Sequence, residues 1–128
     1  MGRIIASVTI ENTVMPDKKL RCDAFVDTGA SHMVLPTAWK DRLGNLEEMR
    51  RVQLETATQE TIEGVIYGPV RIQIEGFPAI FTEVLFVDMQ PEAGEYDPLI
   101  GYIPLKQSQA AVDMLGHRLV HVGRLDLK

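Results

Sequence analysis

Hydrophobic and polar residues alternate along much of this chain, with the two-residue period of β-strands that bury one face. The alternation runs through residues 4–10 and resumes over 20–26, and the segment between them contains Asn, Pro and several charged residues. Two alternating runs separated by such a break predict a β-hairpin. A second hairpin is predicted from 52–56 and 62–74, because both segments are rich in β-forming residues.

The remaining segments add strands and two short helices. Residues 77–88 predict a further strand, which a polar loop over 89–98 follows, and 119–122 predict a last strand. Helices are predicted over 37–43 and 105–115, because each segment has a proline just ahead of it and a glycine just behind it. The chain is therefore predicted to be mostly β.

Length and composition favour a single globular domain over 1–128. The chain has 128 residues and a mass of 14.3 kDa, and 45% of its residues are hydrophobic. That size is enough for one core and too small for two. No run approaches the roughly 18 apolar residues of a membrane span, so no membrane partner is expected. The first residues lack the pattern of a secretory signal, and a cytoplasmic location is expected.

Charge and cysteine content narrow the possible partners. The formal net charge is -5, the pI is about 5.1, and the Lys and Arg residues are scattered along the sequence. A nucleic-acid partner is therefore not expected, since binding phosphate backbones requires a basic patch. Cys22 is the single cysteine, so no disulfide within the chain is possible, and its place in an alternating run predicts a small buried core residue.

The stretch AFVDTGASHMVLP, residues 24–36, interrupts two apolar runs with an acid and a glycine. Asp-Thr-Gly is by itself an ordinary turn tripeptide. A simple hairpin turn would need neither the flanking apolar runs nor the later element Pro98-Leu99-Ile100-Gly101 ahead of a predicted helix. This context favours a functional role for Asp27.

These residues resemble a known family. Residues 25–31, with Leu35 and Pro36 after them, are similar to the active-site loop of aspartic proteases, and 98–101 resemble the second hydrophobic-hydrophobic-glycine motif of the retroviral-type, retropepsin-like branch. The resemblance covers roughly residues 4–122 and suggests a bacterial or cellular member. It implies an all-β fold, namely a retropepsin-like closed β-barrel with one C-terminal α-helix and a flap hairpin.

The implied activity is that of an aspartic endopeptidase without metal or other cofactor. Hydrolysing a peptide without a metal or a covalent intermediate needs two acids. One carboxylate takes a proton from water, and one carboxylic acid protonates or hydrogen-bonds the carbonyl oxygen. A chain with one Asp-Thr-Gly loop supplies only one of these acids. The resemblance therefore implies a homodimer in which a two-fold axis brings the two copies of Asp27 together, with an extended peptide as the substrate.

The resemblance also implies roles for the residues near Asp27. The Thr28 hydroxyl would bond across the dimer axis, and the hairpin around 56–63 would close over the substrate as a flap. Gly29 would let backbone approach the carboxylate, and Gly101 would let its strand cross tightly behind the loop. The predicted site comprises catalytic Asp27, Thr28 and Gly29, substrate-binding Ala30, Ser31 and Thr58, and Ile100 and Gly101 in support of the loop.

Several residues depart from the viral pattern or leave alternatives open. Viral members usually carry an acid where Ser31 stands and an arginine where Tyr102 stands, and this chain has neither. His32 adjoins the motif and could line a pocket, without an assigned role. The alternative to a protease is a catalytically silent β-barrel of the same fold that serves as a dimerisation or peptide-binding module. A stable monomer, whose lone Asp27 has no partner, is a further alternative.

Overall fold

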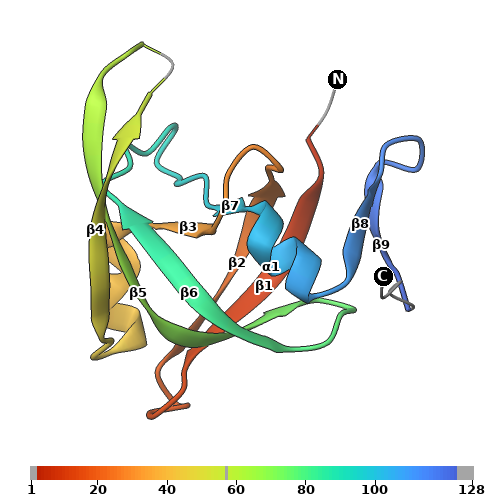
Figure 1. The fold of residues 1–128 in the computed structure, drawn as a ribbon, viewed down its shortest axis with the longest axis horizontal. Coiled ribbons are helices and arrows are strands. Elements are labelled where there is room, and N and C mark those ends of the chain that lie inside the picture. Colours follow the sequence, from red (N-terminus) through yellow and green to blue (C-terminus); the bar gives the residue numbers. More distant parts are fainter. Residues whose placement is uncertain (1–2, 57, 124–128) are drawn as a thin grey trace, which may run out of the picture.

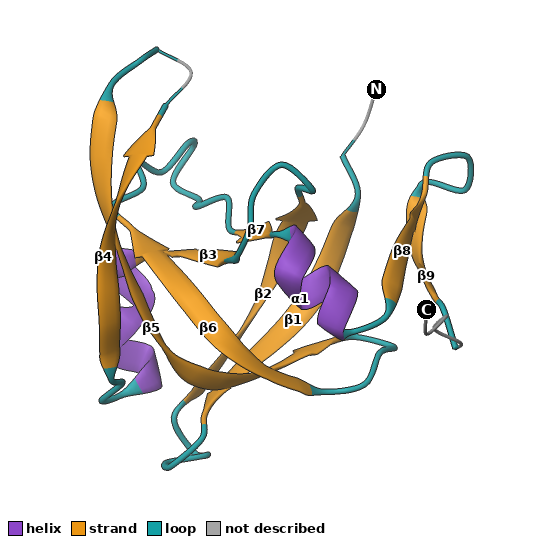
Figure 2. Cartoon of the chain, in the orientation of Figure 1, coloured by secondary structure: helices purple, strands orange, loops and turns teal. Residues whose placement is uncertain are grey.

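The computed structural model describes residues 3–56 and 58–123, which are mostly β-strand (Figures 1 and 2). Both predicted hairpins, the strand within 77–88, the polar loop after it and the last strand are present. The elements in chain order are β1 (Ile5–Asn12), β2 (Lys19–Val26), β3 (Met33–Pro36), the 3-10 helix η1 (Thr37–Leu43), β4 (Glu48–Glu55), β5 (Thr61–Ile74), β6 (Ile80–Val87), β7 (Leu99–Ile100), α1 (Tyr102–Gln107), β8 (Ala110–Asp113) and β9 (Arg118–His121).

Six strands close into a barrel. The sheet has the order β1-β2-β7-β3-β6-β5-β4, and an additional pairing of β1 with β5 joins its ends so that β4 stays outside the closed ring. Figure 1 shows the β4–β5 hairpin extending beyond the barrel at the upper left. The loop between β2 and β3 also lies in the upper part of this view, nearer its centre. The predicted all-β barrel with a protruding hairpin and one C-terminal α-helix is confirmed.

The alternating pattern places the core inside this barrel. In the antiparallel pair of β1 and β2, Val8 lies opposite Cys22 and Ile10 lies opposite Leu20. Val8, Ile10 and Leu20 are almost completely buried, whereas the intervening residues are more exposed. Cys22 is only half-buried and packs against the core cluster, so its predicted core position holds in part.

Strand β3 is buried on both faces, unlike β1 and β2. Met33 and Leu35 belong to the main core, whereas Val34 belongs to a second cluster with residues of β5 and β6. Leu54 of β4 and Ile62 of β5 pack against this second cluster. A strand between two apolar layers carries a continuous apolar run, which explains the sequence Met-Val-Leu-Pro. The second cluster also packs against the inner face of the β4–β5 hairpin.

The predicted helix over 105–115 is present with different bounds, and most of that segment is not helical. The helix α1 is short and ends at Gln107, and the chain then turns at Gln109, whose φ is 58°, into strand β8. Strands β8 and β9 form a separate two-stranded sheet beside the barrel. The predicted helix over 37–43 is present with these bounds as a 3-10 helix. No helix among the described residues is long and apolar enough to cross a membrane.

Candidate functional site

The loop between β2 and β3, which carries Asp27, is tied by its backbone to the segment 100–103. We call residues 27–32 the Asp27 loop. Four backbone hydrogen bonds join the two segments. The bonds run from the N–H of Asp27 to the carbonyl of Ile100 (3.0 Å), from Gly101 to His32 (3.0 Å), from Tyr102 to Ala30 (2.8 Å) and from Ile103 to Ser31 (3.0 Å).

Inside the loop, the Asp27 carboxylate accepts a backbone hydrogen bond. The N–H of Gly29 donates to Oδ1 of Asp27 at 2.9 Å, and the N–H of Ala30 donates to the Asp27 carbonyl at 3.1 Å. A Cβ on Gly29 would lie 3.2 Å from the same carboxylate oxygen. Asp27 is partly exposed and Thr28 is exposed. The carboxylate is therefore oriented by the backbone and remains accessible from outside the barrel.

Gly101 lies directly behind the Asp27 loop. A Cβ at this position would lie 2.5 Å from the carbonyl oxygen of His32 and 2.7 Å from that of Ala30, which is closer than real Cβ atoms come to backbone. Ile100, the residue before it, is completely buried in the core. Glycine is thus required sterically where 100–103 crosses the loop. The structure places Ile100 and Gly101 directly behind the loop, and their supporting role stays a prediction.

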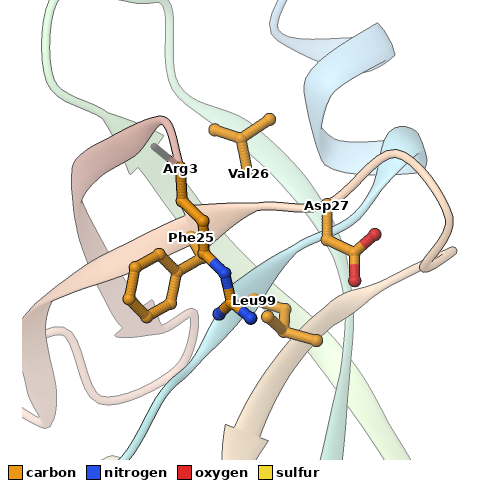
Figure 3. Close-up of a pocket in the computed structure, with 5 residues that line it drawn as sticks. All are labelled: Arg3, Phe25, Val26, Asp27 and Leu99. Atoms are coloured by element: carbon orange, nitrogen blue, oxygen red, sulfur yellow. The ribbon is translucent and has the colours of Figure 1, made fainter. Parts of the chain in front are cut away.

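A pocket of about 400 Å³ opens beside Asp27 (Figure 3). Phe25, Val26, Leu99 and Arg3 line it together with Asp27. The guanidinium carbon of Arg3 lies 4.7 Å from the centre of the Phe25 ring, and Figure 3 shows this guanidinium next to Leu99. Sequence analysis did not identify Arg3, because it lies far ahead of the motif and only the pairing of β1 with β2 brings it to the pocket.

Thr58 is not brought to the Asp27 loop. It is exposed on the turn of the β4–β5 hairpin, and its hydroxyl lies 3.0 Å from that of Thr56. Thr56 also receives the N–H of Glu60 on its hydroxyl oxygen, at 3.2 Å. Ala57, within the predicted flap, lies outside the described residues. The substrate-binding role of Thr58 stays a prediction that a closed flap would have to fulfil.

A charged cluster adjoins the loop on the side of His32. The ring of His32 contacts Ser31 and Glu83, and Glu83 also pairs with Arg50. The hydrogen bonds from the Arg50 guanidinium hold the pKa of Glu83 below its usual value. Partial burial opposes this shift, and the smaller contribution of the His32 contact adds to it. Sequence analysis singled out His32 without finding these partners. In the described ranges, no group of three or more His, Cys, Asp or Glu residues could hold a metal ion.

Comparisons with known proteins agree with this geometry. A sequence family described as aspartyl protease matches residues 6–102. No curated protein matches the chain. Among solved structures, the EIAV protease in complex with the inhibitor HBY-793 has a similar fold, with a TM-score of 0.60 and 23% sequence identity over 82% of this chain and 86% of that one. The expected retropepsin-like fold is thereby confirmed.

Proposed function

Because the chain belongs to the aspartyl protease family, we propose that it is an endopeptidase that cleaves extended peptides as a homodimer. The observation that carries this proposal is the Asp27 carboxylate, which is partly exposed at a pocket and oriented by the N–H of Gly29. The described residues contain one such loop. A second carboxyl group must therefore come from a second copy of the chain.

In the proposed dimer, the two Asp27 carboxyl groups share one proton. Two carboxyl groups about 3 Å apart do not both ionise, so one remains protonated while the other is a carboxylate. The carboxylate takes a proton from a water molecule, whose oxygen attacks the scissile carbonyl carbon. The protonated partner donates its proton to the carbonyl oxygen. The tetrahedral intermediate then collapses: the amide nitrogen leaves with the proton that the pair holds, and one hydroxyl group of the intermediate returns its proton to the pair, which regains its starting state.

The neighbours of Asp27 support this chemistry by position. Gly29 has no side chain, so its N–H reaches the carboxylate without steric hindrance. Thr28 is exposed next to Asp27, where its hydroxyl can bond to the partner protomer. Ala30 and Ser31 continue the loop and are partly exposed, as residues that line a peptide cleft must be. Thr58, on the turn of the β4–β5 hairpin, would contact the peptide when the hairpin closes over it.

Exposed apolar residues near the loop support an interface with a second copy. Ile5 is 57% exposed, and it pairs with Phe25 in the strand that leads to Asp27. Tyr102 is 51% exposed, and its N–H is bonded to the loop at Ala30. Apolar side chains that are exposed in one protomer gain free energy when a partner covers them.

Replacing Asp27 tests the proposed chemistry. We expect Asp27→Asn to lower peptide cleavage by about 10³-fold or more, because an amide cannot take the proton of water. A random peptide library, digested at several pH values, gives the measurement. Asp23→Asn is the matched control, since Asp23 is an exposed acid on the same strand, and it should cleave like the wild type. Cleavage by Asp27→Asn at the wild-type rate would exclude the proposal, and binding of peptides without cleavage by the wild type would favour the silent module.

Mixing the wild type with Asp27→Asn tests whether the active unit is a dimer, independently of the chemistry. If each active unit needs two copies of Asp27, exchange of wild type with an equal amount of Asp27→Asn leaves roughly a quarter of the dimers fully wild type. Activity per wild-type chain should then fall by about half. A sedimentation measurement at micromolar concentration accompanies it. Activity that stays proportional to the amount of wild-type chain, or a monomer that is active, would contradict the shared site.

A further inference from the structure

Arg3 brings a positive charge into the pocket beside Asp27. Its guanidinium carbon lies over the Phe25 ring, and in the view of Figure 3 the Leu99 side chain lies between this guanidinium and the Asp27 carboxylate. In the part of the chain that the structure describes, no carboxylate forms an ion pair with Arg3. The donors of the guanidinium are therefore available to an anion that enters the pocket.

The turn of the β8–β9 hairpin fixes the backbone at Arg3. Nε2 of His117 lies 3.0 Å from the carbonyl oxygen of Arg3, and the ring donates, because a carbonyl oxygen only accepts. The Phe25 ring holds the other end of the residue, since a guanidinium is attracted to the face of an aromatic ring. Arg3 and His117 both lie outside the range 6–102 that matches the aspartyl protease family. The placement of this charge is thus a feature of this chain that the family match does not include.

The lining of the pocket suits a side chain with an apolar stem and an acidic end. Phe25, Val26 and Leu99 supply apolar surface, and the volume of about 400 Å³ is enough for one side chain of a peptide. The Arg3 guanidinium can bind a carboxylate with two parallel hydrogen bonds. Asp27, at the same pocket, would repel an acidic side chain if Arg3 were absent, because like charges in one site disfavour each other. The sign of the charge that the pocket accepts therefore depends on Arg3.

We propose that Arg3 makes this pocket select a glutamate or aspartate side chain of the bound peptide, near the scissile bond. Arg3 binds the carboxylate of that side chain, and His117 is a positioning residue that holds Arg3 at the pocket. The inference rests on the proposed function and names the class of its substrates, namely peptides with an acidic residue close to the bond that is cleaved. A pocket that takes only apolar side chains would be expected instead if the guanidinium did no more than cover the Phe25 ring.

Matched peptides test the selection by kinetics. In a peptide that the wild type cleaves, each position near the scissile bond carries glutamate in one version and glutamine, which has nearly the same shape, in the other. At one position the wild type should cleave the glutamate version with a kcat/KM about three- to tenfold higher, mainly through a lower KM. Arg3→Met should lose this preference, and Arg3→Glu should prefer lysine there. Arg21→Met is the matched control, since Arg21 pairs with Glu75 and does not line the pocket, and it should keep the preference.

The outcomes of this experiment decide both roles. A wild type that cleaves peptides without preferring glutamate at any position overturns the inference, and so does a preference that Arg3→Met retains. His117→Ala should reduce the preference about twofold or more while kcat for the glutamine version stays the same, because only the placement of Arg3 changes. An unchanged preference in His117→Ala would refute the positioning role of this ring.

Binding to the full-length Asp27→Asn variant separates this inference from the proposed function. Fluorescent glutamate and glutamine versions of library peptides that this variant binds are titrated with it, and one glutamate version should bind about three- to tenfold more tightly. The double variant with Arg3→Met should not distinguish the two. If the wild type cleaves no peptide but this binding preference is present, the proposed function is wrong and the selection by Arg3 is supported. Equal binding of every pair overturns the inference even where the wild type cleaves peptides, and a variant that binds no peptide of the library overturns it as well.

Discussion

The Asp27 loop and the flap hairpin, by which we mean β4, β5 and the turn between them, are held by different means. The loop is short, and backbone hydrogen bonds tie it to 100–103 over the buried Ile100. The outer face of the flap hairpin carries exposed ion pairs, such as that of Arg51 with Glu63 at 2.8 Å. Its inner face packs apolar residues on the second core cluster.

The difference matches the two tasks that we propose for these regions. A carboxylate that must meet its copy across a two-fold axis needs a position that solvent and salt do not change, and buried backbone bonds provide it. A segment that admits and covers a substrate needs to open, and exposed ion pairs cost little to break. The comparison predicts large effects of substitutions behind the loop and small effects on the outer face of the hairpin.

The largest effect on stability is expected for Gly101→Ala. Its Cβ would overlap the carbonyl oxygens of His32 and Ala30, so the loop and the crossing strand would have to separate. We expect a loss of about 3 kcal/mol or more in the free energy of unfolding, measured by urea denaturation. Gly123→Ala, where no described residue other than its neighbour in the chain lies within 4 Å of the added carbon, should change it by less than about 0.5 kcal/mol. Equal stability of Gly101→Ala and the wild type would show that this crossing does not hold the loop.

An intermediate effect is expected from Cys22, on the strand that leads into the loop. Burial, and then the nearby charge of Asp23, raises the pKa of this thiol from 9.0 to about 11. The folded state therefore binds the thiol proton of Cys22 more tightly than the unfolded state does. The contribution of the neutral thiol to the free energy of unfolding is complete below pH 9 and is lost as the pH rises toward 11. Relative to Cys22→Ala, the wild type should lose about 2 kcal/mol between pH 9 and pH 11.

Denaturation of both proteins over this pH range gives the measurement, and the difference between them removes the titration of the Tyr and Lys residues that they share. If the free energies of unfolding of the wild type and Cys22→Ala differ by the same amount from pH 8 to pH 11, water reaches the thiol. Strand β2 would then be less tightly packed beneath the loop than its half-buried cysteine indicates.

The smallest effect on stability is expected for Arg51→Gln on the flap hairpin. Its guanidinium bonds Glu63 and, at 3.3 Å, Glu48, but the side chain is 58% exposed. The free energy of unfolding should change little, and the difference should shrink at high salt. Thermal denaturation at two salt concentrations provides the test. A loss as large as that of Gly101→Ala would break the comparison between the two regions.

Much of the fold could be predicted because strands with one buried face alternate apolar and polar residues in the sequence. Both hairpins were identified in this way, whereas the motif around Asp27 was identified by its resemblance to the active-site loop of aspartic proteases. The segment after Pro104 was mistaken for a long helix, because a proline ahead of it and a glycine behind it mark a helix but also occur at turns and strand ends. Only the turn at Gln109 and the pairing of β8 with β9 decide between them. The cytoplasmic location, the single domain and the roles of the site residues stay predictions.

The candidate site was predictable where its residues are neighbours in sequence. Asp27, Thr28 and Gly29 carry their own signature, and Gly101 belongs to a second short motif. Arg3 and Glu83 carried no local signal, since each meets the loop only through strand pairing.

By itself, the amino-acid sequence determined the two large hairpins, the sharp turn after Asp27 and the glycine behind it, because these depend on local periodicity and on the absence of a side chain. The tertiary structure alone decided which strands close the barrel and which charges surround His32. Glu83 lies far from His32 along the chain, and the parallel pairing of β3 with β6 places it there. Such pairing depends on the shape and apolar surface of whole strands, which no short stretch of sequence specifies.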